Sequence, residues 1–488
     1  MDTKKLRQKV LDLAIHGKLV KQDPNDEPAS ILLDRIRAEK ARLVKEGKIK
    51  KSDLVEKPIS EDEIPFEVPE GWEWCRIGNV AYLLNGDRSS NYPNKNEYVP
   101  QGIAWINTGH IEPNGYLSTL SMNYITEDKY NSLSSGKIEK GDLVYCLRGA
   151  TYGKVAKVEP YEKGAVASSL MIIRSLNINI RDYIFTYLKS SFSKAQLQIF
   201  ANGAAQPNLA AKDVSKYLIP LPPLAEQHRI VKAVDELFEQ IDIIERSEKE
   251  LEEAANKTRD KLLNLAIQGH LVPQDPNEEP ASVLLERIRA EKARLVKEGK
   301  LKKKDLEEKP ISPDEIPFDI PEGWEWCRLG LLVDFSKSKS VKPDQIKEND
   351  WVLDLEDIEK GTGRLLQKKR MIDIASKSDK HIFKRGNVLY SKLRPYLNKV
   401  IIADEDGYCT SEILVFDFGE VYNKYAQYYL MSSFFVDYAM KDAYGVKMPR
   451  VGSNQGNSAL LPLPPLSEQR RIVTKLEELL QEIDKLKA

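Results

Sequence analysis

The sequence lacks several features that would place it in familiar classes of protein. Its apolar runs all fall well short of the roughly 20 residues that cross a bilayer, so we expect no membrane-spanning helix. Its four cysteines are far apart and show no CxxC spacing, which excludes a dense disulfide framework and a zinc site of that pattern. The N-terminus has no uninterrupted apolar segment of the kind found in signal peptides. We therefore expect a reduced, cytoplasmic protein.

Residues that carry common catalytic chemistry are also scarce. Adenine methylation requires an NPPY- or DPPF-like loop, and the sequence has none. The segment GATYGKV at 149–155 is one residue too short between its glycines for a phosphate-binding loop and lacks the Ser or Thr after the lysine. No metal-ligand pair at helical spacing occurs among the five histidines, which are His16, His110, His228, His270 and His381. The sequence thus predicts no active site, metal or cofactor in this chain.

The net charge of −1 gives little indication of a nucleic-acid partner. The sum hides a local imbalance, since residues 79–218 come to roughly +4 and residues 330–460 to roughly +2. The intervening segments carry the compensating acid. This distribution is compatible with DNA binding but does not indicate it by itself.

An internal repeat organises the chain. Residues 11–78 match residues 263–330 without a gap, and the shared sequence includes RIRAEKARLVKEGK and PEGWEWCR. A second pair follows at a different offset, LPPLAEQHRIV at 221–231 and LPPLSEQRRIV at 463–473. Between these repeated blocks lie two inserts, 79–220 and 331–462, with little obvious identity. Duplication followed by divergence of the inserts is the simplest explanation.

The repeated frame is predicted to be helical. After residue 225 the apolar residues alternate steps of four and three, which predicts a helix over 226–267 with a heptad seam, roughly 60 Å long. The C-terminal segment repeats the same phase. The predicted seam residues are Ile230, Val234, Leu237, Ile241, Ile244, Leu251, Leu262, Leu265, Ile472, Leu476, Leu479 and Ile483.

The two chain ends together resemble a second copy of this long helix. Residues 468–488 match its first half and residues 1–16 match its second half, as if a circle had been cut inside one of two equivalent helices. Two antiparallel helices of this kind would give the monomer a pseudo-two-fold axis, the symmetry with which proteins meet two half-sites on DNA. Long heptad helices are also typical of simple dimerisation or spacer elements, but that interpretation leaves the circular register unexplained.

Each repeat carries a shorter helix and then an extended connector. The segment 29–48 begins after Pro28 and stops near Gly47, and its duplicate occupies 281–300. Its Lys- and Glu-rich face is typical of a solvated surface, with partner docking as the alternative. The following segment KPISEDEIPFEVPEGW is punctuated by prolines and is predicted to be extended. The four tryptophans of the frame, Trp72, Trp74, Trp324 and Trp326, are interpreted as packing anchors.

The two inserts show the same order of predicted elements despite their divergence. In the first, 138–158 and 164–174 are rich in strand-forming residues, and in the second 381–403 and 407–417 correspond to them. A helix follows in both, at RDYIFTYLKSSF and KYAQYYLMSSFF. Each insert then ends with a polar or glycine-rich loop before the LPLPPL junction. We expect both inserts to share one mixed α/β fold.

The motifs PEGWEWCR and PLPPLxEQxRIV, each present twice and in alternation, resemble the hallmarks of DNA-specificity subunits of type I restriction-modification systems. The resemblance covers essentially the whole chain. It implies an α+β fold with two α/β target-recognition domains joined by two long antiparallel coiled-coil helices. It also implies a non-catalytic subunit that binds a bipartite DNA target and positions two N6-adenine methyltransferase subunits. A translocase–nuclease subunit would join them for restriction, and S-adenosylmethionine and ATP with magnesium would bind to these partners.

The resemblance and the repeat together predict the domain boundaries. Residues 1–20 and 467–488 are the two parts of the distal helix, and 225–268 is the central long helix. The target-recognition domains are 71–224 and 323–466. The helix–connector blocks are 21–70 and 269–322, additional to the family pattern.

Polar and cationic residues on insert loops are the candidates for DNA contact, since Lys and Arg bind phosphates and Arg, Lys, Asn, Gln and Ser read bases. In the first insert they are Arg88, Ser89, Asn91, Tyr92, His110, Arg148, Lys154, Gln206 and Asn208. In the second insert they are Lys337, Lys339, Lys342, Lys392, Arg394, Lys399, Lys447, Arg450, Asn454 and Gln455. A DNA-binding adaptor of another phage-defence complex, acting without methylation, is the alternative function. An adjacent methyltransferase gene would discriminate the two.

Overall fold

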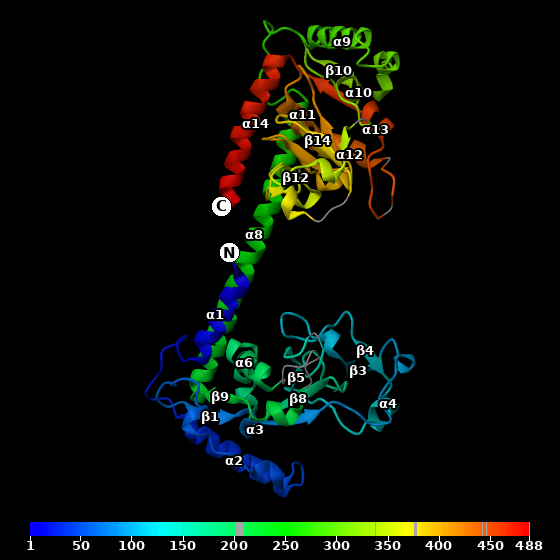
Figure 1. The fold of residues 1–488 in the computed structure, drawn as a ribbon. Helices are drawn as coiled ribbons and strands as arrows, with labels where there is room; N and C mark the ends of the chain where they lie inside the picture. Colours follow the sequence, from blue (N-terminus) through cyan, green and yellow to red (C-terminus); the bar gives the residue numbers. More distant parts are fainter. Residues whose placement is uncertain are drawn as a thin grey trace. The chain divides into compact units, whose positions relative to one another are not determined.

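A computed structural model describes residues 1–149, 151–200, 209–336, 338–374, 378–441, 443–445 and 447–487. The chain divides into two compact units, Met1–Ser247 and Glu248–Ala488. The boundary falls inside one long helix, α8 (Leu224–Ile267), which therefore contributes to both units (Figure 1). The finer division into seven segments stays a prediction.

Unit 1 combines helices with three small sheets. Its helices are α1 (Thr3–Ile15), α2 (Ala29–Lys45), α3 (Ile77–Val80), α4 (Glu127–Ser132), α5 (Arg181–Lys189), α6 (Ser191–Phe200), α7 (Ala211–Val214) and the first part of α8. Its strands are β1 (Glu73–Arg76), β2 (Ala81–Asn85), β3 (Ile103–Ile106), β4 (Asn123–Ile125), β5 (Leu143–Cys146), β6 (Val155–Lys157), β7 (Gly164–Val166), β8 (Leu170–Ser175) and β9 (Leu218–Leu221). The sheets have the orders β2-β8-β5-β6, β4-β3-β7 and β1-β9.

Unit 2 repeats this plan with variations. Its helices are the second part of α8, α9 (Ala281–Lys297), α10 (Leu329–Leu332), α11 (Asn423–Met431), α12 (Ser433–Lys441), α13 (Ser453–Ser458) and α14 (Leu466–Lys487). Its strands are β10 (Glu325–Arg328), β11 (Ser340–Val341), β12 (Trp351–Leu353), β13 (Lys369–Arg370), β14 (Lys380–Phe383), β15 (Val388–Ser391), β16 (Val400–Ile402), β17 (Gly407–Thr410), β18 (Ile413–Phe416) and β19 (Leu460–Leu463). The sheets have the orders β16-β15-β18, β11-β14-β17-β12-β13 and β10-β19.

These elements confirm the mixed α+β class and most of the predicted pattern. The strand-rich segments of the inserts form β5 to β8 in unit 1 and β14 to β18 in unit 2. The single helix predicted after them is broken in both inserts, into α5 and α6 at Ser190 and into α11 and α12 at Ser432, where the backbone is extended. The long helix begins at Leu224, two residues before its predicted start, and ends at Ile267 as predicted. The helix predicted over 29–48 ends at Lys45.

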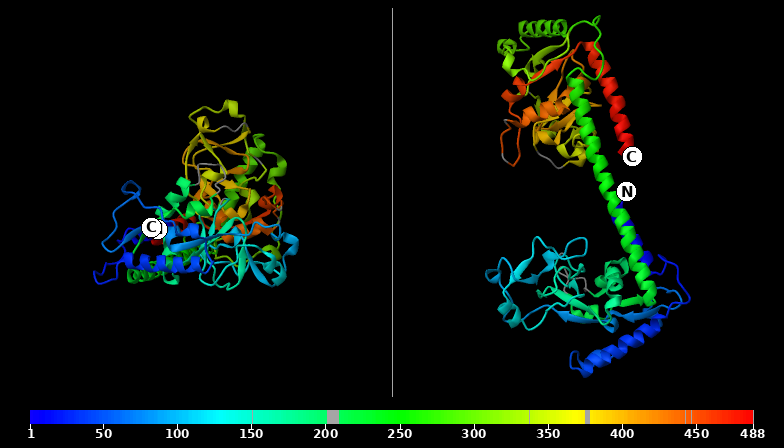
Figure 2. Two further views of the ribbon diagram at one scale, coloured as in Figure 1. Left: turned by 90° about the horizontal axis from the view of Figure 1, so that it is seen from below. Right: turned by 180° about the vertical axis from the view of Figure 1, so that it is seen from behind.

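Within each unit, α8 lies beside a chain end and runs antiparallel to it (Figures 1 and 2). In unit 1, Arg7 of α1 forms an ion pair with Asp242 at 2.6 Å, and farther along Gln22 donates a hydrogen bond to Glu226 at 2.9 Å. In unit 2, Arg259 pairs with Asp484 of α14 at 2.6 Å. The chain ends therefore pack on α8 in the way that the repeat predicts for each unit.

The predicted helix seam is only partly buried. Ile230, Val234, Ile241, Ile472, Leu476 and Ile483 are buried, and Ile244, Leu262, Leu265 and Leu479 are half-buried. Leu237 and Leu251 are 40% and 42% exposed, so the prediction of burial is wrong for these two residues in their units.

Both departures have a structural cause. Phe238 packs against the unit 1 core in place of Leu237, with Arg7 5.2 Å above its ring, because a 3.6-residue period moves the buried stripe off a strict heptad. Leu251 lies on α8 between Glu245, which pairs with Arg7 of α1, and Arg259, which pairs with Asp484 of α14.

The repeated motifs are explained by one buried contact that occurs in both units. The indole Nε1 of Trp72 donates to Glu226 at 3.0 Å, and Trp324 donates to Glu468 at the same distance. These contacts join the PEGW motif to the EQ of PLPPLxEQ and hold the strand pairs β1-β9 and β10-β19 against the start of α8 and α14. Trp72 and Trp324 are therefore packing anchors, as predicted.

Candidate nucleic-acid interface

In unit 1, several polar loops meet at one end of the sheet β2-β8-β5-β6. The register pairs Asn85 with Met171 and Tyr145 with both Met171 and Val155, so β2 and β5 end there while β8 and β6 begin there. The backbone NH of Leu147 donates to Ser169 at 2.9 Å, which joins the loop after β5 to the loop before β8. We name residues 86–94, 147–149, 151–154 and 167–169 the first loop cluster.

The corresponding end of the sheet β16-β15-β18 in unit 2 has the same hydrogen bonds. Lys392 stands where Leu147 stands in unit 1, and its NH donates to the carbonyl of Glu412 at 3.0 Å. Its own carbonyl accepts from Val451 at 3.1 Å, as that of Leu147 accepts from Leu209 at 3.2 Å. We name residues 392–399, 411–412 and 447–451 the second loop cluster. The expectation of a common fold for the two inserts is thus confirmed in detail at this sheet end.

A buried carboxylate organises the first loop cluster. Asp87 is fully buried and accepts hydrogen bonds from the Ser89 hydroxyl at 2.7 Å and from the backbone NH groups of Ser134 and Ser135 at 2.9 and 3.1 Å. Burial by itself would raise the pKa of Asp87, but the hydrogen bonds from the serines outweigh it and the pKa is lowered. The ionised Asp87 therefore anchors the loop that carries Arg88.

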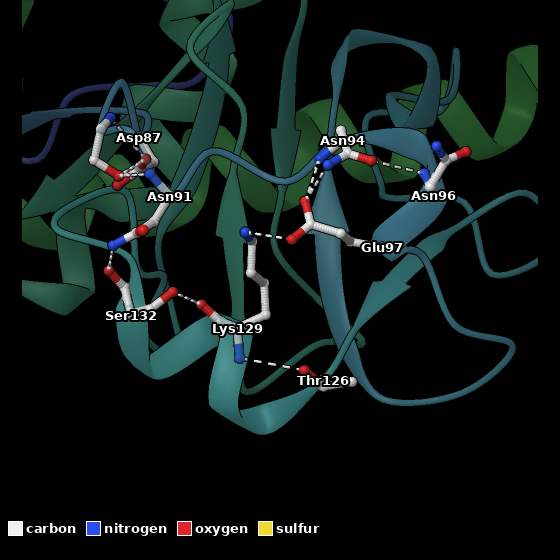
Figure 3. A network of polar contacts seen from close by, with 9 residues as sticks. Asp87, Asn91, Asn94, Asn96, Glu97, Thr126, Lys129 and Ser132 are labelled. Atoms are coloured by element: carbon white, nitrogen blue, oxygen red, sulfur yellow. Dashed lines mark hydrogen bonds and ion pairs between the residues drawn. The ribbon is translucent and has the colours of Figure 1, made fainter.

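The rest of that loop is tied to α4 (Figure 3). The Asn91 side chain donates to the carbonyl of Ser132 at 2.9 Å, and Lys129 pairs with Glu97 at 2.6 Å. The Tyr92 ring meets Trp105 edge-on at 5.1 Å. Ser89 and Asn91 are thus occupied in shaping the loop, whereas Arg88 is exposed.

The structure brings part of the predicted DNA-contact set together at these two sheet ends. Arg88, Ser89, Asn91, Tyr92, Arg148 and Lys154 lie in the first loop cluster, and Lys392, Arg394, Lys399, Lys447 and Arg450 lie in the second. Lys339 and Lys342 are exposed but flank β11 at the edge of the other sheet. Asn454 is exposed on α13. Lys337, Gln206 and Asn208 lie outside the described residues.

Two of the predicted contacts are corrected by their surroundings. His110 is buried, and its Nδ1 accepts a hydrogen bond from the NH of Asn107 at 3.1 Å; burial lowers the pKa of this imidazole. The Gln455 amide donates to the carbonyls of Tyr438 and Ala439, at 2.9 and 3.2 Å, so it joins α13 to α12. Both side chains stabilise the fold, because a buried polar group needs a partner inside the protein.

Two cations of the second loop cluster are also engaged within the chain. Lys399 donates to the carbonyl of Leu355 at 2.6 Å, and burial lowers the pKa of its ammonium group. Arg450 pairs with Glu412 at 3.0 Å. In the described part of the chain, no ion pair engages Arg88, Arg148, Lys154, Lys392, Arg394 or Lys447, which leaves these cations available to an anionic ligand.

Sequence reasoning missed the residues that position these loops. Asp87 and Glu412 are acidic, and a search for DNA contacts considers cations and amides. The D-x-S spacing of Asp87 and Ser89 was the available signal, since aspartate side chains accept hydrogen bonds from the residues two positions later.

The described residues show neither a metal centre nor a membrane span. No group of three or more His, Cys, Asp or Glu side chains in the described ranges is arranged to hold an ion. Likewise, none of the helices described here has the length and apolar character needed to cross a bilayer.

Comparison with known proteins assigns the family. The model of the type I restriction modification DNA specificity domain matches residues 69–253 and 321–488. The chain is 32% identical to the type I restriction enzyme EcoAI specificity subunit of Escherichia coli and 30% identical to the EcoEI specificity subunit, in each case over 99% of this chain and 90% of the relative. A chain in a solved structure of the type I R-M system has a similar fold, with a TM-score of 0.58 and 21% identity over 87% of this chain and 93% of that one.

The chain therefore belongs to the family of type I restriction-modification specificity subunits. This confirms the resemblance drawn from the repeated motifs. It also confirms that the chain is a specificity subunit and not an enzyme on its own. Residues 21–68 and 273–320, which contain α2 and α9, fall outside the matched ranges.

Proposed function

We propose that this chain reads a split sequence in double-stranded DNA, with the first loop cluster at one half-site and the second loop cluster at the other. The observation that supports this most directly is one hydrogen-bonded sheet end, present in both units, with different side chains on it. Lys392 replaces Leu147, and the first loop cluster carries the cations Arg88 and Arg148, whereas the second carries Arg394 and Lys447. A shared scaffold with different polar side chains is what two different half-sites require.

The helical frame supplies the second half of the proposal. The long helices act as a coiled coil with a pseudo-two-fold, circularly repeated arrangement that sets the spacing between the half-sites. Each copy of the frame carries one N6-adenine methyltransferase subunit, and a translocase–nuclease subunit joins for restriction. The paired contacts Trp72–Glu226 and Trp324–Glu468 support this, because two equivalent frames offer two equivalent docking places.

The chemistry then belongs to the partners. S-adenosylmethionine binds the methyltransferase subunits, and ATP with magnesium binds the translocase–nuclease. We place the assembly in the cytoplasm, in agreement with four cysteines that are all buried and free of disulfides.

Exchange of one insert tests the proposal. Residues 79–220 are replaced by the corresponding insert of a relative with a different target, and the methylated motif is determined with the methyltransferase subunit present. We expect one half of the motif to change and the other half to stay. The matched exchange of residues 331–462 should change the other half. A change in both halves from a single exchange would contradict independent reading by the two units.

A further inference from the structure

The connection between β5 and β6 in unit 1 contains two glycines with left-handed backbone. Gly149 has φ +83° and Gly153 has φ +80°. In unit 2 the connection between β15 and β16 has left-handed backbone at Arg394, with φ 51°, and at Asn398, with φ 48°. Glycine adopts this region freely, whereas in other residues the Cβ crowds the carbonyl oxygen.

The hydrogen bonds show that these positions are equivalent. The NH of Cys146 donates to the carbonyl of Lys154 at 2.8 Å, and the NH of Ser391 donates to Lys399 at 3.0 Å. Two residues after each strand end, the carbonyl of Arg148 accepts from the Cys146 thiol at 3.2 Å and that of Leu393 accepts from the Ser391 hydroxyl at 2.9 Å. Arg394 thus stands at the position of Gly149, and Asn398 at that of Gly153.

Arg394 and Asn398 are the two non-glycine residues with positive φ in the described part of the chain. Asparagine tolerates this conformation, and the Asn398 amide also donates to the carbonyl of Met431 at 2.6 Å, which gives it a structural role. Arginine has neither advantage here. A strained residue that glycine could replace without strain points to a role for its side chain.

The surroundings of Arg394 leave its side chain without a partner. Its backbone NH donates to the carbonyl of Pro449 at 2.7 Å, which fixes the turn against the loop that ends in Arg450. Its Nε is buried without a hydrogen bond. The neighbouring acid Glu412 is already paired with Arg450 at 3.0 Å. Within the described residues no carboxylate pairs with the Arg394 guanidinium.

We propose that Arg394 is a specificity-determining residue that reads a guanine in the half-site bound by unit 2. The guanidinium presents two parallel NH donors that match O6 and N7 of guanine in the major groove, and a strained, hydrogen-bonded turn fixes their direction. Because Gly149 has no side chain, this contact belongs to one half-site only. The inference rests on the proposed function, since it requires that the second loop cluster meets DNA.

The test compares R394G, R394A and R394K in the full chain with its methyltransferase subunit. The methylated motif is determined by sequencing, duplex affinity by titration, and stability by thermal melting. We expect R394G to melt no lower than the unaltered protein, because glycine relieves the strain. At one position of a single half-site the requirement for guanine should be lost, so that any base is accepted there. Affinity for the original duplex should fall on the order of 10- to 100-fold. R394K should relax the same position, since lysine keeps the charge but not the paired donors.

Arg385 provides the matched control, because it is exposed and precedes β15 at the opposite end of the strand. We expect R385A to leave the motif unchanged. An unaltered guanine requirement in R394G and R394A would overturn the inference while the proposed function stands. If R394G and R394A weaken DNA binding equally on all sequences and R394K restores it, the inference is overturned in favour of a phosphate contact. If the unaltered protein directs no sequence-specific methylation, the proposed function itself fails.

Discussion

The buried carboxylate of Glu226 should stabilise the start of α8 by an amount that follows from its hydrogen bonds. Glu226 is 1% exposed, and its two oxygens accept separate hydrogen bonds, one from the Trp72 indole at 3.0 Å and one from the Gln22 amide at 2.9 Å. In E226Q one of these oxygens becomes an NH₂ group. That group faces a donor, so one charge-assisted hydrogen bond is lost and a buried donor has no acceptor.

The loss should be about 2 kcal/mol, since hydrogen bonds to charged groups contribute about 1.5–3 kcal/mol. This corresponds to a roughly 30-fold larger equilibrium constant for local opening at the start of α8. We expect a destabilisation confined to unit 1, because the partner contacts of Glu226 all lie there.

Native-state hydrogen exchange measures this opening residue by residue. The amides of residues 224–234 should exchange about 30-fold faster in E226Q, whereas residues 466–476 of α14 serve as the internal reference and should be unchanged. E236Q is the control substitution, because Glu236 is exposed on the same helix and its contact to Lys232 is 3.8 Å long. Equal exchange in E226Q and the unaltered protein would refute the role assigned to this contact.

Three further predictions concern acid stability, backbone strain and spacing. Hydrogen bonds from Arg328 and Ser312 lower the pKa of Glu315 from 4.5 to about 2, so its ionised form stabilises unit 2 above pH 4.5, and this contribution is lost as the pH falls toward 2. In E315Q the unfolding free energy should therefore depend less on pH between 4.5 and 2. An unchanged pH dependence would refute the role assigned to Glu315. Gly17 and Gly47 both have left-handed backbone, with φ +67° and +71°, but only at Gly17 would an added Cβ lie 2.4 Å from Pro69. By chemical unfolding, G47A should lower the unfolding free energy by about 1 kcal/mol through backbone strain, and G17A should lower it clearly more. Equal losses of unfolding free energy would exclude the steric explanation. Four residues inserted after Ser247 lengthen α8 by about 6 Å, so the spacer of the methylated motif should become longer by one or two base pairs. Methylation at the original spacing would contradict the proposal that α8 sets the distance between the half-sites.

The sequence predicts the frame well because two independent signals agree there. Apolar periodicity marks α8 to within two residues at its start, and the repeat assigns its counterparts at the two chain ends. The strict heptad fails at Leu237, because a helix that packs on a domain follows a period of 3.6 residues and packs the half-buried Phe238 ring against the core instead. The motif PEGWEW identifies an anchor, but its partner Glu226 is 154 residues away and becomes visible only in the fold.

The interface is less predictable, because exposure and hydrogen bonding decide which loop side chains are free. His110 and Gln455 have suitable chemistry for reading bases, but the side chains of both form hydrogen bonds inside their own unit. Arg394 also looks like an ordinary loop cation in the sequence. Its left-handed backbone and its buried, unpartnered Nε become visible only in the fold.

We propose that this chain directs methylation to a split DNA sequence. Its most direct test is long-read methylation sequencing of DNA from cells that carry the chain with a methyltransferase subunit, compared with cells that lack only this chain. We expect a two-part motif of methylated adenines that is present in the first cells and absent from the second. Methylation that is identical in both, or no motif despite an intact methyltransferase, would contradict the proposed function.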